Sequence, residues 1–244
     1  MTKKSALITG GAARIGARIA RKLHQAKIDI IIHYRSSDKR AKALAEELNS
    51  ERADSATTVQ GDLLESGVTG RVIQEAVAFK GRLDALINNA STFYPTTVGE
   101  VTEKHWDDLI GTNTKVPFFL SQAATPWLKK SRGCIVNLVD IHALRPKKSY
   151  PVYSIAKAAN AMMVKSLALE LGPEIRVNGV APGVILWPEH DISDAEKREV
   201  LSRIALQRPG DPDDIADTVA FLVTGPGYIS GQIIAVDGGR TVQQ

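Results

Sequence analysis

The chain alternates short, continuous apolar segments with longer segments of helical periodicity, and this alternation restricts its fold more than any other feature. Seven segments have the length and apolar content of buried strands, at 6–9, 28–34, 57–60, 85–88, 134–138, 176–180 and 233–236. Helical patterns separate them, at 15–25, 37–49, 67–80, 103–128, 153–171 and 213–222. Strands that are apolar on both faces and alternate with helices are typical of a parallel sheet covered on both sides. The sequence therefore predicts an α/β fold with a doubly wound, parallel, seven-stranded sheet.

Length and composition indicate one globular unit. At 244 residues and 43% hydrophobic content, the chain suffices for one full core, and no linker, repeat or low-complexity segment interrupts it. We therefore expect a single domain over residues 1–244. No segment approaches about eighteen apolar residues, and the first four residues lead directly into a strand, so we expect a cytoplasmic protein that makes no membrane contact.

Charge and special residues argue against several other classes of protein. The formal charge of +4 is spread among acids and aromatic residues make up 5% of the chain, so no nucleic-acid site is expected. Five scattered histidines show no metal-ligand spacing, and we predict no metal. The single Cys134 lies in an apolar strand and is expected to be a buried residue.

A glycine-rich turn follows the first predicted strand. Residues 9–16 read Thr-Gly-Gly-Ala-Ala-Arg-Ile-Gly and open the first predicted helix. Backbone N–H groups of such a turn, together with the helix N-terminus, can hold a pyrophosphate. The turn therefore predicts a dinucleotide site.

The end of the second predicted strand indicates which dinucleotide binds. An NAD site usually has an acid there for the ribose hydroxyls, but this strand leads into His33, Tyr34, Arg35 and Ser36. A guanidinium and hydroxyls suit a 2′-phosphate, which a carboxylate would repel. NADPH is therefore the predicted cofactor, with a basic loop of no specificity as the alternative.

Tyr153, Lys157 and Asp140 form the candidate catalytic set. Tyr153 and Lys157 stand four residues apart in a helical pattern and so share a face, and Asp140 follows the strand at 134–138. An ammonium beside a phenol lowers the phenol pKa, whereas a carboxylate raises it. We expect the two influences together to keep Tyr153 a neutral proton donor. The Tyr-x-x-x-Lys spacing alone is weak, because solvated helix faces also show it.

In order along the chain, the motifs resemble those of the short-chain dehydrogenase/reductase family. The resemblance spans nearly the whole chain, through the turn at 9–16, Asp62, Asn88-Asn89-Ala90, Asn113, Tyr153 with Lys157, Pro182-Gly183 and Asp237-Gly238-Gly239. It implies a Rossmann-like fold with its catalytic region at 137–160. Arg14 replaces the middle glycine of the turn and Asp140 replaces the usual serine. Both departures resemble the pteridine reductases, as does the segment at 89–95, Asn-Ala-Ser-Thr-Phe-Tyr-Pro.

The motifs and the resemblance together give a predicted site. Its catalytic residues are Asp140, Tyr153 and Lys157. The predicted cofactor-binding residues are Gly10, Arg14, Ile15, Gly16, His33, Tyr34, Arg35, Ser36, Asp62, Leu63, Asn89, Ala90, Ser91, Tyr153, Lys157, Pro182 and Gly183. The predicted substrate-binding residues are Arg14, Ser91, Phe93, Asp140, Tyr153 and Trp187, with Phe93 stacked on a flat substrate. Asn113 is expected to support the helix and a proton relay.

The resemblance implies NADPH-dependent reduction of pterins, such as biopterin and dihydrobiopterin, and by extension of folate and dihydrofolate, to tetrahydro forms. Residues 184–206 are expected to form a substrate lid, with an ordinary loop as the alternative, and Trp187 either closes over the substrate or packs in a subunit contact. A homotetramer is implied, and the long apolar helices at 103–128 and 153–171 support it. Two other functions stay open: a carbonyl reductase acting on a 3-oxoacyl or sugar ketone, and a non-catalytic NADPH-binding regulator, which the intact Tyr153 and Lys157 disfavour.

Overall fold

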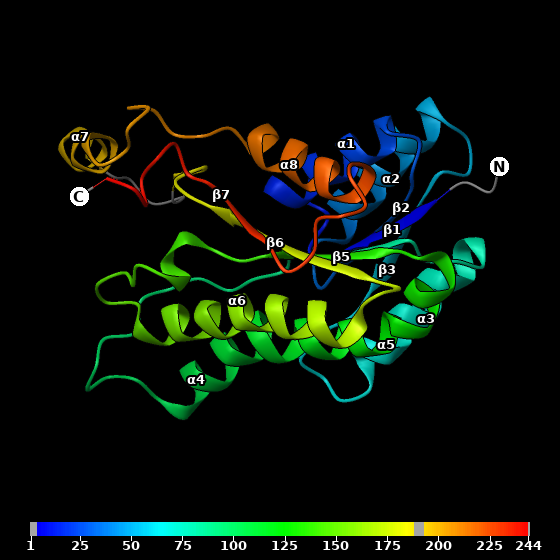
Figure 1. Cartoon of the computed structure of the whole chain (residues 1–244), viewed down its shortest axis with the longest axis horizontal. Helices are drawn as coiled ribbons and strands as arrows, with labels where there is room; N and C mark the ends of the chain where they lie inside the picture. Colours follow the sequence, from blue (N-terminus) through cyan, green and yellow to red (C-terminus); the bar gives the residue numbers. More distant parts are fainter. Residues whose placement is uncertain (1–3, 188–192, 244) are drawn as a thin grey trace.

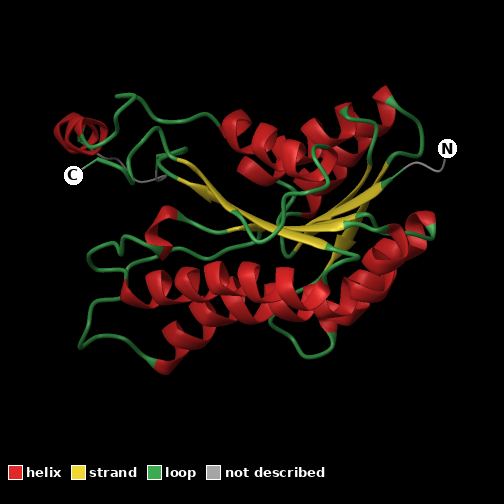
Figure 2. Cartoon of the chain, in the orientation of Figure 1, coloured by secondary structure: helices red, strands yellow, loops and turns green. Residues whose placement is uncertain are grey.

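The computed structural model describes residues 4–187 and 193–243 and shows one sheet with helices on both faces (Figure 1, Figure 2). The strands are β1 (Ser5–Ile8), β2 (Asp29–Tyr34), β3 (Ala56–Gln60), β4 (Ala85–Asn88), β5 (Cys134–Leu138), β6 (Arg176–Pro182) and β7 (Ile233–Val236). All neighbouring strands are parallel, in the order β3-β2-β1-β4-β5-β6-β7. The predicted doubly wound seven-stranded sheet is confirmed.

Helices cover the sheet in two layers. The upper layer in Figure 1 contains α1 (Arg14–Gln25), α2 (Asp38–Glu51) and α8 (Pro212–Thr224). The lower layer contains α3 (Val68–Lys80), α5 (Val116–Ser131) and α6 (Pro151–Leu171), with α4 (Glu103–Ile110) beside α6. The carboxyl ends of the strands point toward the end of the molecule that carries α7 (Asp194–Ser202) and the C-terminus. Among the described residues, no helix has both the length and the apolar content to cross a bilayer.

The strands are apolar on both faces because the sheet separates two cores. Ile30 and Ile32 of β2 pack in the core beneath α1 and α8, whereas Ile31 packs in the core that α3 and α5 cover. All three side chains are fully buried. Burying a side chain of this size contributes about 1.5–3 kcal/mol. The continuous apolar segments of the sequence are therefore a requirement of the two cores.

The helix predicted at 103–128 contains an irregularity. A π-helical turn, Gly111–Lys115, joins α4 to α5. Pro117 has no N–H and cannot donate to the carbonyl of Asn113, four residues earlier. The side-chain Nδ2 of Asn160 in α6 donates to that carbonyl oxygen instead, at 2.7 Å. This contact ties the segment between α4 and α5 to α6, and single π turns of this kind are frequent at functional sites.

Two further elements had no counterpart in the sequence prediction. A short 3-10 helix, Ile141–Ala143, begins directly after Asp140. The other is α7, which starts at a capping box: Ser193 Oγ accepts from the backbone N–H of Glu196 at 3.2 Å, and Glu196 Oε2 accepts from that of Ser193 at 2.9 Å. None of the α7 residues is buried, so its sequence lacks the apolar period by which helices are recognised.

Candidate active site

The predicted site residues gather at the carboxyl ends of the strands. β1 pairs with β4 in the middle of the sheet, and β2 lies on the other side of β1, so the strand order reverses between β1 and β4. Connections leave the sheet toward opposite faces at such a point and open a crevice between them. The candidate site is built around this crevice.

The turn between β1 and α1 is shaped for close approach of a ligand to its backbone. Gly10 has a φ of +60°, and Arg14 has a φ of +52°, which non-glycine residues rarely adopt. A Cβ on Gly16 would lie 2.4 Å from the carbonyl oxygen of Gly10 and 2.7 Å from Nδ2 of Asn89. Ala13 at the N-cap of α1 has no side-chain acceptor, which leaves the first N–H groups of the helix for an anion.

Thr9 and Asn89 join this turn to the loop after β4. Nδ2 of Asn89 donates to the carbonyl oxygens of Thr9 at 2.8 Å and Gly10 at 3.2 Å. The backbone N–H groups of Asn89 and Ala90 both donate to Oγ1 of Thr9, at 2.9 Å each. The structure thus brings Gly10, Gly16, Asn89 and Ala90 together, as the sequence prediction required.

His33 lies beneath the turn, and this position differs from its predicted contact with the cofactor. Because the backbone N–H of Gly10 donates to Nδ1 of His33 at 3.3 Å, Nε2 carries the proton and donates to the carbonyl oxygen of Gly61 at 3.1 Å. Burial lowers the pKa of His33 to about 4. Both ring nitrogens are engaged and the side chain is 2% exposed, so His33 shapes the turn from below.

The end of β2 places a cation beside the turn. Arg35 is exposed, and its Nη1 lies 4.0 Å from Oδ2 of Asp62, its nearest carboxylate among the described ion pairs. An exposed pair at this distance is weak, so the guanidinium is available to a phosphate. Tyr34 is buried and its hydroxyl donates to Asp38 at 2.6 Å. Arg35, Ser36 and Asp62 therefore lie on the surface, whereas Tyr34 packs beneath it.

Asp140, Tyr153 and Lys157 meet where β5 ends and α6 begins. The hydroxyl of Tyr153 donates to Oδ2 of Asp140 at 2.7 Å, and Oδ1 of Asp140 accepts from the backbone N–H of His142 at 2.8 Å. The ammonium of Lys157 donates to the carbonyl oxygen of Leu138 at 2.8 Å. Tyr153 and Lys157 are both buried. The structure brings the three predicted catalytic residues together.

The electrostatics of this set favour a neutral phenol. Burial raises the pKa of Tyr153 well above its ordinary value, and the charge and hydrogen bond of Asp140 raise it further. Burial lowers the pKa of Lys157 to about 8, and the negative charge of Asp140 offsets part of this lowering. Of the two opposing influences that we expected, Asp140 contacts the phenol directly, whereas the Lys157 ammonium is held by the carbonyl of Leu138. The direction of the pKa agrees with the expected neutral phenol, and the role of Tyr153 as a proton donor stays a prediction.

Phe93 lies at the mouth of the site, 46% exposed. Its ring stacks on Tyr150 with centroids 4.6 Å apart at 16°, and it meets Tyr153 edge-on at 4.8 Å and 75°. Nζ of Lys147 lies 5.0 Å from the Phe93 centroid and 4.4 Å from the Tyr150 centroid. One face of Phe93 is thus covered by Tyr150, so a stacked substrate would use the other face. Tyr150 and Lys147 escaped the sequence reasoning, although an aromatic residue three positions before Tyr153 was an available signal.

Buried amides support the site from behind. Nδ2 of Asn88 donates to Oδ1 of Asn137 at 2.9 Å, and Nδ2 of Asn137 donates to Oδ1 of Asn160 at 3.1 Å. Asn160 reaches Asn113, whose Nδ2 donates to the carbonyl oxygens of Thr92 at 3.0 Å and Leu109 at 2.9 Å. Asn113 therefore anchors the loop that carries Phe93, as well as the helix, which agrees with its expected supporting role.

The other predicted residues lie around the rim. Ser91 and Arg14 are exposed, Ile15 packs partly against the core, and Leu63 is buried. Gly183, after Pro182, packs so closely that a Cβ would lie 2.7 Å from Cα of Asp237. Trp187 is partly exposed. Positions 188–192 of the predicted lid lie outside the described residues, and the described remainder includes α7.

Metal ligands do not cluster in the parts of the chain that the structure describes: no three His, Cys, Asp or Glu side chains are grouped so as to hold an ion.

Known proteins resemble the chain along its whole length. A family model described as enoyl-(acyl carrier protein) reductase matches residues 10–241. The 3-oxoacyl-[acyl-carrier-protein] reductase FabG of Staphylococcus aureus is 37% identical over 240 residues, which cover 97% of each chain. The corresponding protein of Staphylococcus epidermidis is 35% identical, covering 97% of this chain and 98% of its own. Pteridine reductase 1 of Leishmania tarentolae is 35% identical over 282 residues, covering 99% of this chain and 97% of its own.

The turn geometry predicts that Gly16→Ala weakens dinucleotide binding by at least about tenfold, because the new methyl group displaces the carbonyl of Gly10 or the side chain of Asn89. Titration of NADPH followed by its fluorescence measures the effect. Gly70→Ala is the matched control, since a Cβ there meets nothing within 4 Å. Equal NADPH affinity for the Gly16→Ala protein and the parent would contradict this account of the turn.

Proposed function

Because the chain belongs to the short-chain dehydrogenase/reductase family of oxidoreductases, we propose that it reduces a C=N bond of pterins with NADPH as the hydride donor. The proposed substrates are biopterin and dihydrobiopterin, and by extension folate and dihydrofolate, which yield tetrahydro forms. The hydrogen bond of 2.7 Å from the Tyr153 hydroxyl to Asp140 is the observation that carries this proposal. Sequence identity over the whole chain does not decide the substrate. The chain is 37% identical to the 3-oxoacyl-[acyl-carrier-protein] reductase and 35% identical to the pteridine reductase, which is nearly the same.

Asp140 opposes ketone reduction electrostatically. Reducing a ketone builds negative charge on its oxygen, and a site for that reaction needs hydrogen-bond donors there. The Asp140 carboxylate accepts hydrogen bonds from Tyr153 and His142, and a carboxylate would repel the developing charge by about 4 kcal/mol at 4 Å, taking an effective dielectric constant of about 20. A ring nitrogen is more basic than a ketone oxygen and can take up a proton as the hydride arrives. Protonation at nitrogen is therefore the chemistry that this set suits best.

Four side chains have separate proposed roles in proton transfer, cofactor binding and substrate stacking. NADPH, when bound, supplies the hydride. Tyr153 is the proton donor to the ring nitrogen, and its burial together with Asp140 keeps it protonated until transfer. Lys157 is placed to bind the nicotinamide ribose, and its pKa of about 8 leaves it charged at neutral pH. The free face of Phe93 would stack on the pterin, and the described parts of the predicted lid, residues 184–187 and 193–206, would cover it.

NADPH is proposed over NADH because of the end of β2. The residues after Ile32 carry no acid before Asp38, whose carboxylate is engaged by the hydroxyl of Tyr34. Arg35 is exposed at this position with only a distant pairing to Asp62. A guanidinium can bind a phosphate through two parallel hydrogen bonds, which gives both affinity and orientation.

Ketone reduction is the second candidate, and the 37% identity to the 3-oxoacyl-[acyl-carrier-protein] reductase favours it. It predicts turnover of 3-oxoacyl thioesters or sugar ketones with little use of pterins. A non-catalytic regulator is the weakest candidate, because the donor hydroxyl of Tyr153, its carboxylate partner and the buried Lys157 are all in place. An NADPH-oxidation assay with biopterin, dihydrobiopterin, folate and a panel of ketones separates the three.

Arg35→Asp should reverse or abolish the preference for NADPH, since it removes the cation and adds a charge that repels the 2′-phosphate. The ratio of kcat/KM values for NADPH and NADH measures this preference. Lys130→Asp, the same charge change at an exposed position of α5, is the control and should leave the ratio unaltered. Equal efficiency of the parent protein with both cofactors would remove the basis of the assignment.

Asp140→Ser should lower the rate of dihydropterin reduction by about a hundredfold or more, the usual cost of losing a well-placed proton-transfer partner, while NADPH still binds. Steady-state assays on dihydrobiopterin and on a ketone panel give the two rates. Tyr153→Phe is the companion variant and should lose turnover of every substrate, because it removes the proton donor. If Asp140→Ser reduces dihydropterin as fast as the parent, the carboxylate is incidental and the pterin proposal fails.

We also propose a homotetramer, because the outer faces of α5 and α6 expose large apolar side chains. Phe118, Phe119, Ile155, Met162 and Leu169 are 41%, 42%, 49%, 60% and 82% exposed, respectively. Large apolar side chains exposed on the outer faces of helices are typical of a protein interface, and closed symmetric assembly is its common outcome.

Light scattering at micromolar concentration should therefore give four times the mass of the chain. Leu169→Glu should lower that mass by placing a charge in the contact. Val98→Glu changes a residue that is equally exposed, at 81%, on the loop before α4, and should leave the mass unaltered. A monomeric mass for the parent would contradict the tetramer.

A further inference from the structure

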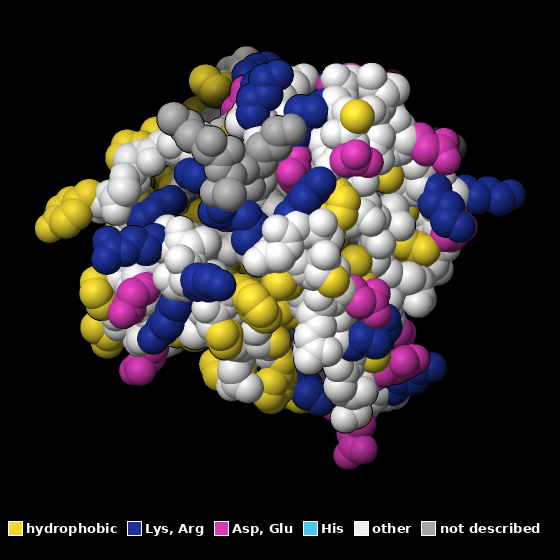
Figure 3. Space-filling view, turned by 90° about the vertical axis from the view of Figure 1, so that its right-hand side faces the viewer, with side chains coloured by type: hydrophobic (Ala, Val, Ile, Leu, Met, Phe, Trp, Pro, Cys, Tyr) yellow, Lys and Arg dark blue, Asp and Glu magenta, His cyan; other side chains and the backbone are white. Residues whose placement is uncertain are grey.

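A second hollow lies at the opposite end of the sheet from the candidate active site. It has a volume of about 120 Å³ and lies among the first residues of β1, β5 and β6 and the last residues of α5 and α8. Cys134, which lines it, begins β5, whereas Asp140 follows the end of that strand, six residues or about 20 Å away. Figure 3 shows this end of the molecule, where several Lys and Arg side chains gather.

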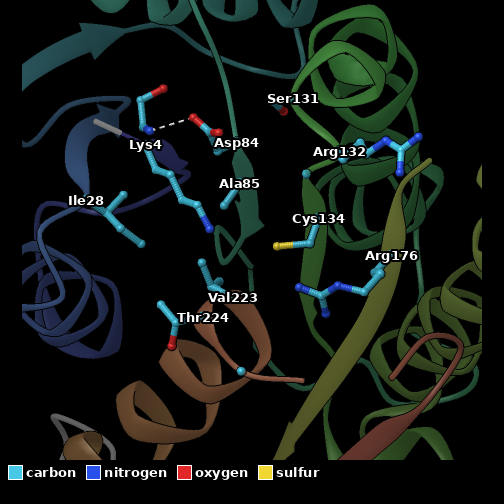
Figure 4. Close-up of a pocket in the computed structure, with 13 residues that line it drawn as sticks. Lys4, Ile28, Asp84, Ala85, Ser131, Arg132, Cys134, Arg176, Val223 and Thr224 are labelled. Carbon is cyan, nitrogen blue, oxygen red and sulfur yellow. Dashed lines mark hydrogen bonds between the residues drawn. The ribbon is translucent and has the colours of Figure 1, made fainter. Parts of the chain in front are cut away.

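Two cations reach into this hollow from opposite sides. The ammonium of Lys4 and the guanidinium of Arg176 point toward its centre, and the sulfur of Cys134 lies between them (Figure 4). Neither cation has a carboxylate within 4.0 Å in the described part of the chain. Arg176 makes one long hydrogen bond, from Nη1 to the carbonyl oxygen of Ile229 at 3.5 Å. Burial raises the pKa of the Cys134 thiol to about 11, so the thiol is neutral and is no counterion.

The one carboxylate that lines the hollow is already neutralised. Asp84 accepts two hydrogen bonds from the guanidinium of Arg82, at 2.5 Å and 2.8 Å, and one from the backbone N–H of Ser5 at 2.8 Å. Its charge is therefore matched by Arg82 and is not available to Lys4 or Arg176.

The C-terminal ends of two helices offset part of the positive charge at this hollow, because cations there stabilise the helix ends. α5 and α8 both end at the hollow, and each helix C-terminus is equivalent to roughly half a negative charge. Two termini thus offset about one positive charge. Lys4 and Arg176 carry two, and Arg132 adds a third at the rim. One to two positive charges stay without a partner.

We propose that this hollow binds a small oxyanion, either free phosphate or the phosphate group of a metabolite, between Lys4 and Arg176. The size agrees, because the volume of about 120 Å³ is far above the roughly 10–15 Å³ that a cavity needs to hold one water molecule. Arg176 offers parallel N–H donors to two oxygens of the anion, and Lys4 offers a point charge from the other side. This site shares no residue with the predicted dinucleotide or substrate sites.

Thermal unfolding with millimolar inorganic phosphate, at constant ionic strength, tests the proposal. Saturating NADPH is present throughout, so that phosphate cannot act through the dinucleotide site. Phosphate at about ten times its dissociation constant should raise the Tm of the parent by about 3 °C. The double variant Lys4→Gln/Arg176→Gln should lose this shift. Lys80→Gln/Lys130→Gln, which removes two positive charges from exposed or partly exposed positions outside the hollow, should keep it.

Lys4→Gln alone changes an exposed residue at the start of the chain, so it provides a reading even if the double variant does not fold. Isothermal titration calorimetry should then show at least about threefold weaker phosphate binding. The proposal is overturned if neither inorganic phosphate nor glucose 6-phosphate shifts the Tm of the parent, or if the shifts are equal in the parent and in the Lys4→Gln and double variants. Because Lys4 and Arg176 lie outside the catalytic set, the result of this comparison does not depend on whether the protein reduces pterins or ketones. A shift that glucose 6-phosphate produces and inorganic phosphate does not would assign the site to a phosphate ester.

Discussion

A sheet that is covered by helices on both faces leaves only its two ends for polar chemistry, and this constraint organises the molecule. Fully buried isoleucines fill both sides of β2. Charged and hydrogen-bonding side chains therefore concentrate where strands stop. At the carboxyl end, the turns after β1 and β4 are joined by Thr9 and Asn89, and Asp140 follows β5. At the other end, Lys4 and Arg176 stand where β1 and β6 begin.

The features that could be predicted from sequence are those that follow from strand and helix periodicity. β5 has the predicted bounds, and the meeting of Asp140 with Tyr153 follows from a strand end and a helix start at one edge of a parallel sheet. Orientation was harder to predict. The sequence does not show that His33 points beneath the turn, or that Pro117 frees a carbonyl for Asn160. α7 was not predicted from the sequence because it buries no apolar face.

Whole-chain similarity and local chemistry carry different information. Most of the chain serves the two cores and the turn that is predicted to hold a dinucleotide, and these parts are needed whatever the substrate is. The comparable identities to a 3-oxoacyl-[acyl-carrier-protein] reductase and to a pteridine reductase agree with this division. The electrostatic character of the proposed proton donor depends on its burial and on one charged neighbour. Asp140 in contact with the Tyr153 hydroxyl raises the pKa of that phenol, which a serine hydroxyl would not do through its charge.

The helix α6 connects the candidate active site to an exposed apolar surface. It is one uninterrupted helix of 21 residues, whose first turns carry Tyr153 and whose outer face exposes Met162 and Leu169. In the proposed tetramer, a neighbouring subunit on the outer face would contact the same helix that positions the Tyr153 hydroxyl against Asp140. Near the middle of this helix, Asn160 donates a hydrogen bond to the carbonyl oxygen of Asn113 and holds α6 against the segment between α4 and α5. One helix thus carries both the proposed subunit contact and the proposed proton donor, at different positions along its length.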